Sequence, residues 1–121
     1  MFQIDFASRV PIYEQLFNNV VKLAGAGVIK PGDKLPPVRI VASQLGINPN
    51  TAAKAYRELE AKGYIYSSVG RGSYLTDKLG SESAQKLEAI REFENAAKKA
   101  VLLGADRALL DELLNKAFES F

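Results

Sequence analysis

Cysteine and histidine are both absent from the 121 residues of this chain. Without cysteine there are no disulfides, thiolate metal sites, iron–sulfur clusters or cysteine nucleophiles. Without histidine the chain lacks the usual general base at neutral pH and a common zinc ligand. These two absences exclude serine triads, thiol proteases and most zinc enzymes. The fourteen acidic residues are scattered along the chain, so we expect neither an enzyme nor a metal or other cofactor.

Long apolar runs are also lacking. No run approaches the roughly 18 residues that a membrane-spanning helix needs. The N-terminal stretch MFQIDFASRVP has neither the basic start nor the apolar core of a signal peptide. We therefore expect a cytoplasmic protein that makes no membrane contact.

The chain has little net charge, only +2, but the charge is unevenly distributed. Residues 1–76 hold nine Lys and Arg against five Asp and Glu, whereas residues 77–121 hold seven against nine. A basic front and an acidic back suit a chain that presents one end to a polyanion.

The first half of the chain contains the patterns of short amphipathic helices. A first helix is expected to begin at Pro11, because proline suits the first helical position, and to end at Gly25–Gly27. A second, over residues 38–45, places four apolar residues on one face and ends at Gly46. A third begins after Asn48, a good N-cap, and ends at Gly63. Its inward face is Ala52, Ala55, Tyr56 and Leu59.

The pattern then changes from helical to extended. Tyr64–Ser68 is rich in β-forming residues, Val69–Gly72 predicts a turn, and Ser73–Thr76 predicts a second short strand. Two short helices joined by a tight turn and followed by a hairpin make a winged helix-turn-helix, whose second helix enters the major groove of DNA.

Candidate DNA-binding residues lie on the outward faces of these elements. The start of the third helix is compact, and its amide and hydroxyl groups can bond base edges or phosphates, with a lysine one turn on. An arginine at the start of the second helix offers a planar fork of donors, and the glycines of the hairpin tip let the backbone approach DNA closely. The set is Arg39, Asn48, Asn50, Thr51, Lys54, Gly70 and Arg71.

The last part of the chain is again helical. We expect a helix from about Ser83 to Leu103, a break at Gly104, and a last helix capped by Asp106. About 40 residues cannot bury a useful core alone, so these helices either fold back on residues 1–76 or pack on a second copy. The amount of apolar surface favours a homodimer. The residues expected at its interface are Leu87, Ile90, Phe93, Val101, Leu109, Leu110, Leu113, Leu114 and Phe118.

Four ordered stretches resemble the DNA-binding half of the GntR family of bacterial regulators: PIYEQL, GDKLPPVRIVASQLGI, NPNTAAKAYRELEAKGYI and VGRGSYL. The third stretch and the short helical end are most similar to the YtrA-like subfamily. That resemblance implies that Arg39, Asn50, Thr51 and Gly70 touch DNA, that the two-helix tail dimerises, and that the targets are transporter operons. In two departures, Pro37 replaces the Ser or Thr that usually caps the second helix, and Ala53 stands where relatives often carry a longer polar residue.

The sequence thus predicts a mainly helical (α+β) protein: a winged helix-turn-helix over residues 1–76, a hinge over 77–82 and a dimerisation region over 83–121. The expected function is that of a sequence-specific regulator, a repressor, which binds a palindromic double-stranded DNA operator as a homodimer. The alternative is a winged-helix module that binds proteins and has no specific DNA binding. Whether a small-molecule effector acts on the protein stays open.

Overall fold

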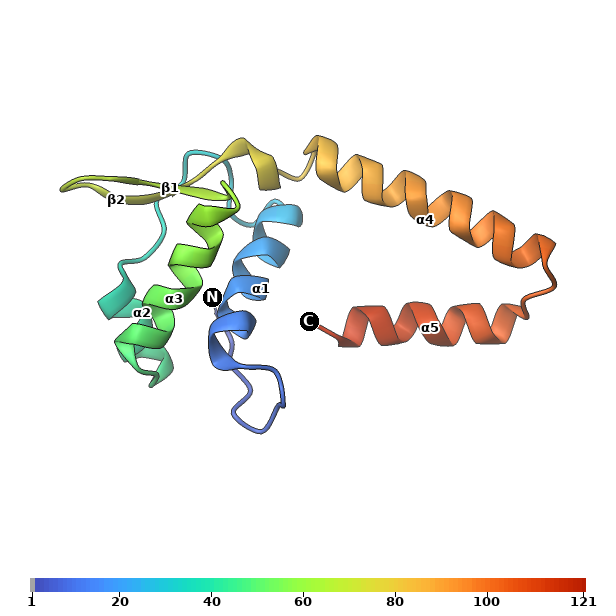
Figure 1. The fold of residues 1–121 in the computed structure, drawn as a ribbon, viewed down its shortest axis with the longest axis horizontal. Helices are drawn as coiled ribbons and strands as arrows, with labels where there is room; N and C mark the ends of the chain where they lie inside the picture. Colours follow the sequence, from blue (N-terminus) through green and yellow to red (C-terminus); the bar gives the residue numbers. More distant parts are fainter. Residues whose placement is uncertain (1) are drawn as a thin grey trace.

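Three helices and a hairpin form the first part of the protein in a computed structural model, which describes residues 2–121 (Figure 1). We call residues 2–79 the body and the two following helices, residues 84–119, the tail. The elements of the body are α1 (Ile12–Gly25), α2 (Val38–Leu45), α3 (Pro49–Ala61), β1 (Ile65–Ser68), β2 (Gly72–Leu75) and a 3₁₀ helix, η1 (Asp77–Leu79). The tail consists of α4 (Ala84–Leu102) and α5 (Arg107–Glu119).

The helix ends follow from local chemistry, with one correction. Pro11 precedes α1 as its N-cap and is not its first helical residue, because its ψ of 144° is extended. Pro37 stands before α2 in the same way and provides no side-chain cap. Gly46 ends α2 with a φ of +67°, a left-handed conformation that glycine adopts at little cost. Asn48 caps α3 as predicted.

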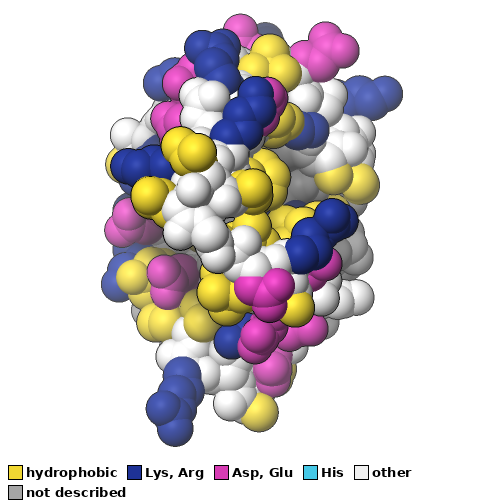
Figure 2. All heavy atoms as spheres, turned by 90° about the vertical axis from the view of Figure 1, so that its right-hand side faces the viewer, with side chains coloured by type: hydrophobic (Ala, Val, Ile, Leu, Met, Phe, Trp, Pro, Cys, Tyr) yellow, Lys and Arg dark blue, Asp and Glu magenta, His cyan; other side chains and the backbone are white. Residues whose placement is uncertain are grey.

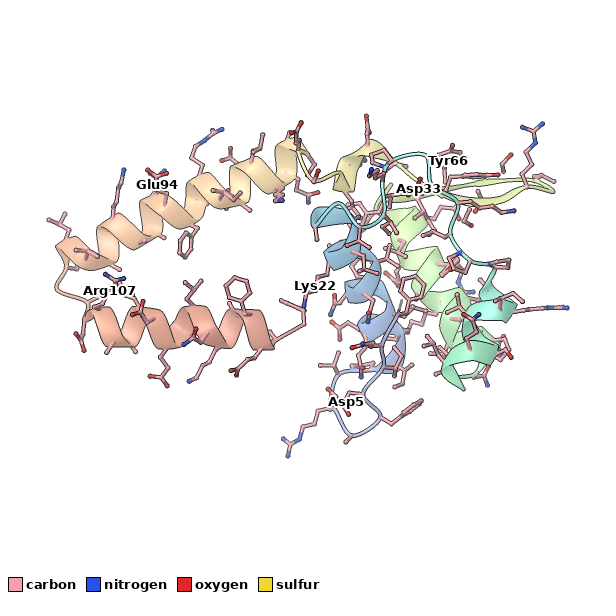
Figure 3. All side chains as sticks on the ribbon, turned by 180° about the vertical axis from the view of Figure 1, so that it is seen from behind. Asp5, Lys22, Asp33, Tyr66, Glu94 and Arg107 are labelled. Carbon is pink, nitrogen blue, oxygen red and sulfur yellow. The ribbon has the colours of Figure 1, made fainter. Side chains whose placement is uncertain are left out.

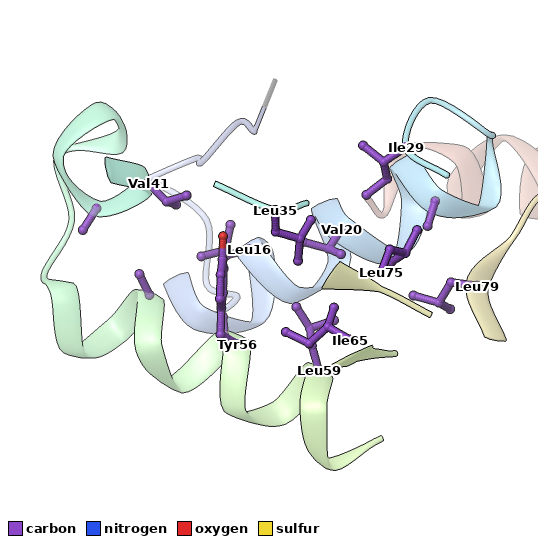
Figure 4. Packing of buried hydrophobic residues seen from close by; sticks show 14 residues of the cluster. Leu16, Val20, Ile29, Leu35, Val41, Tyr56, Leu59, Ile65, Leu75 and Leu79 are labelled. Atoms are coloured by element: carbon purple, nitrogen blue, oxygen red, sulfur yellow. The ribbon is translucent and has the colours of Figure 1, made fainter. Parts of the chain in front are cut away.

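The core of the body lies where α1, α2 and α3 meet the hairpin (Figure 4). α3 packs against both α1 and α2, so its inward face is enclosed on two sides. Ala52, Ala55 and Leu59 are completely buried there, as the periodicity predicts. Apolar side chains of α1 and of the hairpin close the remaining sides, chiefly Leu16, Val20, Ile65 and Leu75.

The hairpin strands are shorter than predicted at the ends away from the turn. β1 and β2 pair antiparallel from Ile65 opposite Leu75 to Ser68 opposite Gly72. Thr76, expected to end the second strand, instead donates its hydroxyl hydrogen to the carbonyl of Gly63, 2.7 Å away, and accepts from the N–H of Lys78. This capping begins η1, whose Leu79 is buried in the core of the body.

The tail leaves the body as two helices that point away from it and return (Figure 1). Neither α4 nor α5 has a buried residue. The ends of the tail are tied to the body by three hydrogen bonds: Lys86 Nζ donates to the carbonyl of Gly25 (2.9 Å), Gln85 Nε2 to the hydroxyl of Tyr64 (3.2 Å), and Lys22 Nζ to the carbonyl of Phe121 (2.7 Å).

The caps of the tail helices agree with the sequence only in part. Ser83 caps α4 by accepting a hydrogen bond from the N–H of Lys86. Asp106 stands at the N-cap of α5, but its side chain makes no capping hydrogen bond, so the prediction that it caps the helix is wrong.

Two kinds of feature are missing between residues 2 and 121. None of the helices there combines the length and the apolar character that crossing a bilayer requires. In the same part of the chain, no group of three or more acidic side chains gathers where it could hold a metal ion.

Tyr56 of α3 generates a prediction about stability and pH. Its hydroxyl donates to the carbonyl of Pro36, and burial raises its pKa from 10.0 to about 12. Because the unfolded chain releases this proton at lower pH than the folded chain, the contribution of Tyr56 to stability falls as pH rises through this window. At neutral pH, Tyr56→Phe should lower the free energy of unfolding by about 1 kcal/mol. This deficit should be constant below pH ~9 and shrink between pH ~10 and ~12 in urea titrations.

The control for that series is Tyr66→Phe, which removes the hydroxyl of an exposed ring on the hairpin. A deficit of Tyr56→Phe that stays constant or grows over the same pH range would contradict the role assigned to the buried hydroxyl.

Candidate DNA-binding surface

The start of α3 is compact and faces outward. Asn48 Oδ1 accepts the N–H of Asn50 at 2.8 Å, which satisfies one of the free donors at the helix start. Asn48 and Asn50 are exposed, and Thr51 is half-buried. The amide group of Asn50 and the hydroxyl of Thr51 are therefore presented at a helix N-terminus, where the helix dipole favours anions.

Lys54 lies one turn further along α3 and contacts another helix. It is exposed, and its ammonium nitrogen is 3.9 Å from the centroid of the Tyr13 ring on α1. A cation–π contact of this kind orients the long side chain without neutralising its charge. The charge of Lys54 is thus held on the outward side of the seam between α1 and α3.

Arg39 occupies the second position of α2 and is exposed. The residues before it, Leu35 and Pro36, are fixed by burial of the Leu35 side chain and by the hydrogen bond from Tyr56 to the Pro36 carbonyl. The backbone that carries Arg39 is therefore anchored, while its guanidinium group projects from the body.

The tip of the hairpin is formed by Val69, Gly70 and Arg71. Gly70 has a φ of +73°, and the N–H of Arg71 donates to the carbonyl of Ser68 at 3.0 Å. Arg71 is exposed, and Val69 is entirely exposed. A tip with a free cation, an exposed valine and a glycine backbone can approach a narrow groove closely.

The basic side chains of the body have no acidic partners. Every ion pair formed between residues 2 and 121 joins two residues of the tail: Glu88–Arg91, Glu94–Lys98, Arg107–Asp111 and Glu112–Lys116. Arg39, Lys54 and Arg71 are therefore available to a polyanion. In the tail, by contrast, four of the six cations, Arg91, Lys98, Arg107 and Lys116, pair with acidic neighbours.

The DNA-binding candidates come from α2, α3 and the hairpin. Figure 1 shows α2 and the hairpin tip on the side of the body opposite to the tail, with α3 beside α2. The residues proposed for DNA contact and those proposed for dimerisation are thus on separate parts of the molecule.

Lys34 is a basic residue near the hairpin that sequence reasoning missed. It forms an isolated β-bridge with Tyr74 of β2. The only local signal for an extended segment here is the alternation of a charged and an apolar residue, Lys34 and Leu35, which the structure shows exposed and buried. Two residues are too few to identify a strand.

The dimerisation candidates are exposed along one side of each tail helix. Leu87, Ile90 and Phe93 on α4 are each more than half exposed, and Phe118 on α5 is 75% exposed. Seen from the tail, apolar side chains gather around a hollow near the middle of this face (Figure 2). Glu94 points outward from α4, whereas Lys22 of α1 faces the end of α5 (Figure 3). Of the remaining candidates, Val101, Leu109, Leu113 and Leu114 are exposed, and Leu110 is half-buried.

A polar pocket of about 380 Å³ lies where the body meets the end of the tail. Its walls come from the N-terminal segment, from α1 and from the end of α5, and they include Asp5, Asn18, Lys22 and Glu119. The pocket could admit a small polar molecule, although most of the polar groups on its N-terminal side already bond to one another.

Comparison with known sequences identifies relatives along most of the chain. The profile described as "Bacterial regulatory proteins, gntR family" matches residues 12–75. The "HTH-type transcriptional repressor YtrA" of Bacillus subtilis is 49% identical over 77 residues, which cover 64% of this chain and 59% of that protein. The "HTH-type transcriptional regulator Rv1152" of Mycobacterium tuberculosis is 34% identical over 104 residues, which cover 86% of this chain and 85% of that protein.

Solved structures resemble both the whole chain and the body alone. A GntR family transcriptional regulator from Listeria monocytogenes is 33% identical with a TM-score of 0.65, over 93% of this chain and 98% of that one. The DNA-binding domain of AraR, solved in complex with operator ORX1, is 27% identical with a TM-score of 0.54, over 63% of this chain and 93% of that one. The winged helix-turn-helix fold predicted from the sequence is thereby confirmed.

The N-cap of α3 leads to a prediction about the stability of the protein. Asn48→Ala removes the acceptor of the Asn50 N–H and should lower the free energy of unfolding by about 1 kcal/mol in urea titrations. The matched control is Asn50→Ala, since the Asn50 side chain makes no hydrogen bond among the described residues, and it should change stability little. Equal losses in the two variants would show that the cap is not what stabilises the helix start.

Proposed function

The chain belongs to the GntR family of bacterial regulatory proteins and is a DNA-binding transcription regulator. We propose that it represses its target genes by occupying a palindromic operator as a homodimer. The observation that carries the proposal is the set of unpaired cations at α2, α3 and the hairpin tip, opposite an apolar tail without a covering partner. The repressor assignment follows the name of the Bacillus subtilis relative.

In the proposed complex, the N-terminal part of α3 lies in the major groove and the hairpin tip reaches the adjacent minor groove. Asn48, Asn50 and Thr51 then meet base edges or phosphates, while Lys54 contacts the backbone. Arg39 has the bidentate geometry that guanine or phosphate accepts. Gly70 and Arg71 complete the set at the hairpin tip. The AraR DNA-binding domain, which shares this fold, is solved in complex with an operator, and this supports DNA binding by the body.

The exposed apolar side chains of the tail support a homodimer. Its leucine, isoleucine and phenylalanine side chains are exposed in the single chain, most of them by about half, and covering each of them with a partner would contribute roughly half of the 1.5–3 kcal/mol that full burial provides. A two-fold dimer would set two α3 helices about one turn of DNA apart and so match a palindromic operator. Residues 1–76 would then serve as the DNA-binding domain, 77–82 as the hinge and 83–121 as the dimerisation region.

The wider setting of the protein follows from resemblance. We place it in the cytoplasm, where its DNA is, and assign it no enzymatic activity, since the relatives are transcription regulators. Its similarity to the YtrA-like subfamily favours transporter operons as targets. Expression profiling with and without the protein tests this, because relief of one operon that encodes a transporter is the expected pattern.

Selection of bound duplexes from a random library tests the proposal directly. We expect a consensus with two inverted half-sites whose centres are separated by about one helical turn. If no duplex is preferred over random DNA, the protein is a winged-helix interaction module and the proposal is wrong.

Arg39 should contribute both affinity and base preference. Arg39→Ala should weaken operator binding by about 1–3 kcal/mol and relax the preference at one base pair of each half-site. The control is Arg107→Ala, which removes an exposed arginine from the tail. Fluorescence anisotropy with the operator and with single-base variants measures both effects. An unchanged operator titration for Arg39→Ala would remove Arg39 from the interface.

Leu113 of α5 tests the dimer. Leu113→Asp should shift the protein from dimer to monomer in sedimentation experiments, because a carboxylate at an apolar interface would be desolvated without a partner. The control, Asn115→Asp, adds the same charge at an exposed polar position two residues away and should leave the dimer intact. A dimer that is equally stable in both variants would place the interface elsewhere.

A further inference from the structure

A third extended segment lies along the outer edge of the hairpin. The N–H of Leu35 donates to the carbonyl of Ser73 at 2.8 Å, and the N–H of Leu75 donates to the carbonyl of Asp33 at 3.0 Å. Lys34, between them, bridges to Tyr74. The backbone of Lys34 is therefore fixed to β2 even though it lies more than thirty residues earlier in the chain.

The Lys34 side chain runs along β2 towards the tip of the hairpin. A β-carbon added to Gly72 would lie 2.8 Å from Lys34 Cε and 3.7 Å from Nζ, so the end of the lysine occupies the space beside this glycine. Gly72 and Tyr74 are two residues apart on one strand and share its face. Lys34 thus lies on the same face as Tyr74.

That face of the hairpin is the outer one. Tyr74 pairs with Tyr66 across the strands, and the two rings stack with centroids 5.4 Å apart. Their strand neighbours Ile65 and Leu75 point the other way and are buried. Figure 3 labels Asp33, next to Lys34, beside the hairpin that carries Tyr66. The stacked rings stiffen the hairpin, so a cation held against it moves with it.

The charge of Lys34 is not neutralised in the protein. No ion pair between residues 2 and 121 includes Lys34. The carboxylate of its neighbour Asp33 accepts the N–H of Lys30 at 2.8 Å and forms no ion pair with Lys34. The ammonium group is thus a free cation close to the tip formed by Val69, Gly70 and Arg71.

We propose that Lys34 is a DNA-binding residue of the hairpin, whose ammonium group contacts a backbone phosphate beside the groove that the tip enters. The proposal rests on the function proposed above and assigns a contact outside the helix-turn-helix and the tip. At a phosphate, a lysine acts as a point charge, and such a contact carries no base preference. The contact therefore strengthens binding to any duplex and positions the hairpin on it.

The same geometry explains why glycine occupies position 72. Its φ of +119° already disfavours other residues, and a β-carbon there would displace the flexible end of the lysine beside it. A substitution there has two separable effects, backbone strain and displacement of Lys34.

The experiment measures affinity for the operator and for random duplex over a range of salt concentrations. Lys34→Met, which keeps an unbranched apolar side chain but loses the charge, should weaken binding to both duplexes several-fold. It should also reduce the slope of log affinity against log salt by about one unit, as expected for one lost phosphate contact. Lys34→Arg should restore the slope. Lys98→Met, at an exposed lysine of the tail, is the matched control and should leave both quantities unchanged.

A second pair of variants tests the lysine–glycine contact independently. Gly72→Ala should reduce affinity more in the wild-type background than in the Lys34→Met background, because only the former has a charged lysine end to displace. Strain at φ is common to both backgrounds and cancels. Additive losses would overturn the link between the two residues.

The outcomes separate the two proposals. If Arg39→Ala impairs operator binding while Lys34→Met leaves affinity and salt slope as in the wild type, Lys34 makes no phosphate contact and only this inference fails. If the wild-type protein binds no duplex in a salt-dependent manner, the proposed function fails, and the inference fails with it.

Discussion

Burial of one face of α3 is the constraint on which the DNA-binding surface depends. Ala52, Ala55 and Leu59 are completely enclosed by α1, α2 and the hairpin. Since a helix repeats every 3.6 residues, fixing this face forces the opposite one, with Asn50 and Lys54, to point outward. The two alanines let α3 lie close to its neighbours. The hydrogen bond from Tyr56 to the Pro36 carbonyl extends the same constraint to the segment that leads into α2.

Local signals in the sequence were enough to predict α2 and α3, because their apolar spacing, Gly46 and Asn48 act over a few residues. Contacts between distant residues were not predictable in this way. The bridge from Lys34 to Tyr74 needs the hairpin to fold first, and the position of Lys54 over the Tyr13 ring needs α1 and α3 to pack. Asp106 failed as a cap because residue type favours a capping hydrogen bond without ensuring its geometry. The roles of the candidate residues in DNA binding stay predictions.

The two tail helices have few stabilising contacts within the single chain. Neither of its helices has a buried residue, and four exposed ion pairs each contribute only about 0.3–0.5 kcal/mol. Helices of 19 and 13 residues are marginal in water without packing. The proposed dimer would supply the stabilising contact that the single chain lacks. Because four of the six tail cations are paired within the tail, what it offers a partner is mainly apolar.

Helix α1 contacts both halves of the molecule. It packs against α3 in the core, its terminal carbonyl at Gly25 accepts from Lys86 of α4, and its Lys22 donates to Phe121 beyond α5. A change in the angle of the tail would therefore act on α1, as well as on η1 and Tyr64, which also contact α4. Both ties are single exposed hydrogen bonds, each contributing only about 1 kcal/mol, whereas the contact between α1 and α3 is a packed core. The junction with the tail should consequently yield before the DNA-binding surface deforms, so a dimer would adapt to operator spacing by pivoting where the tail meets α1.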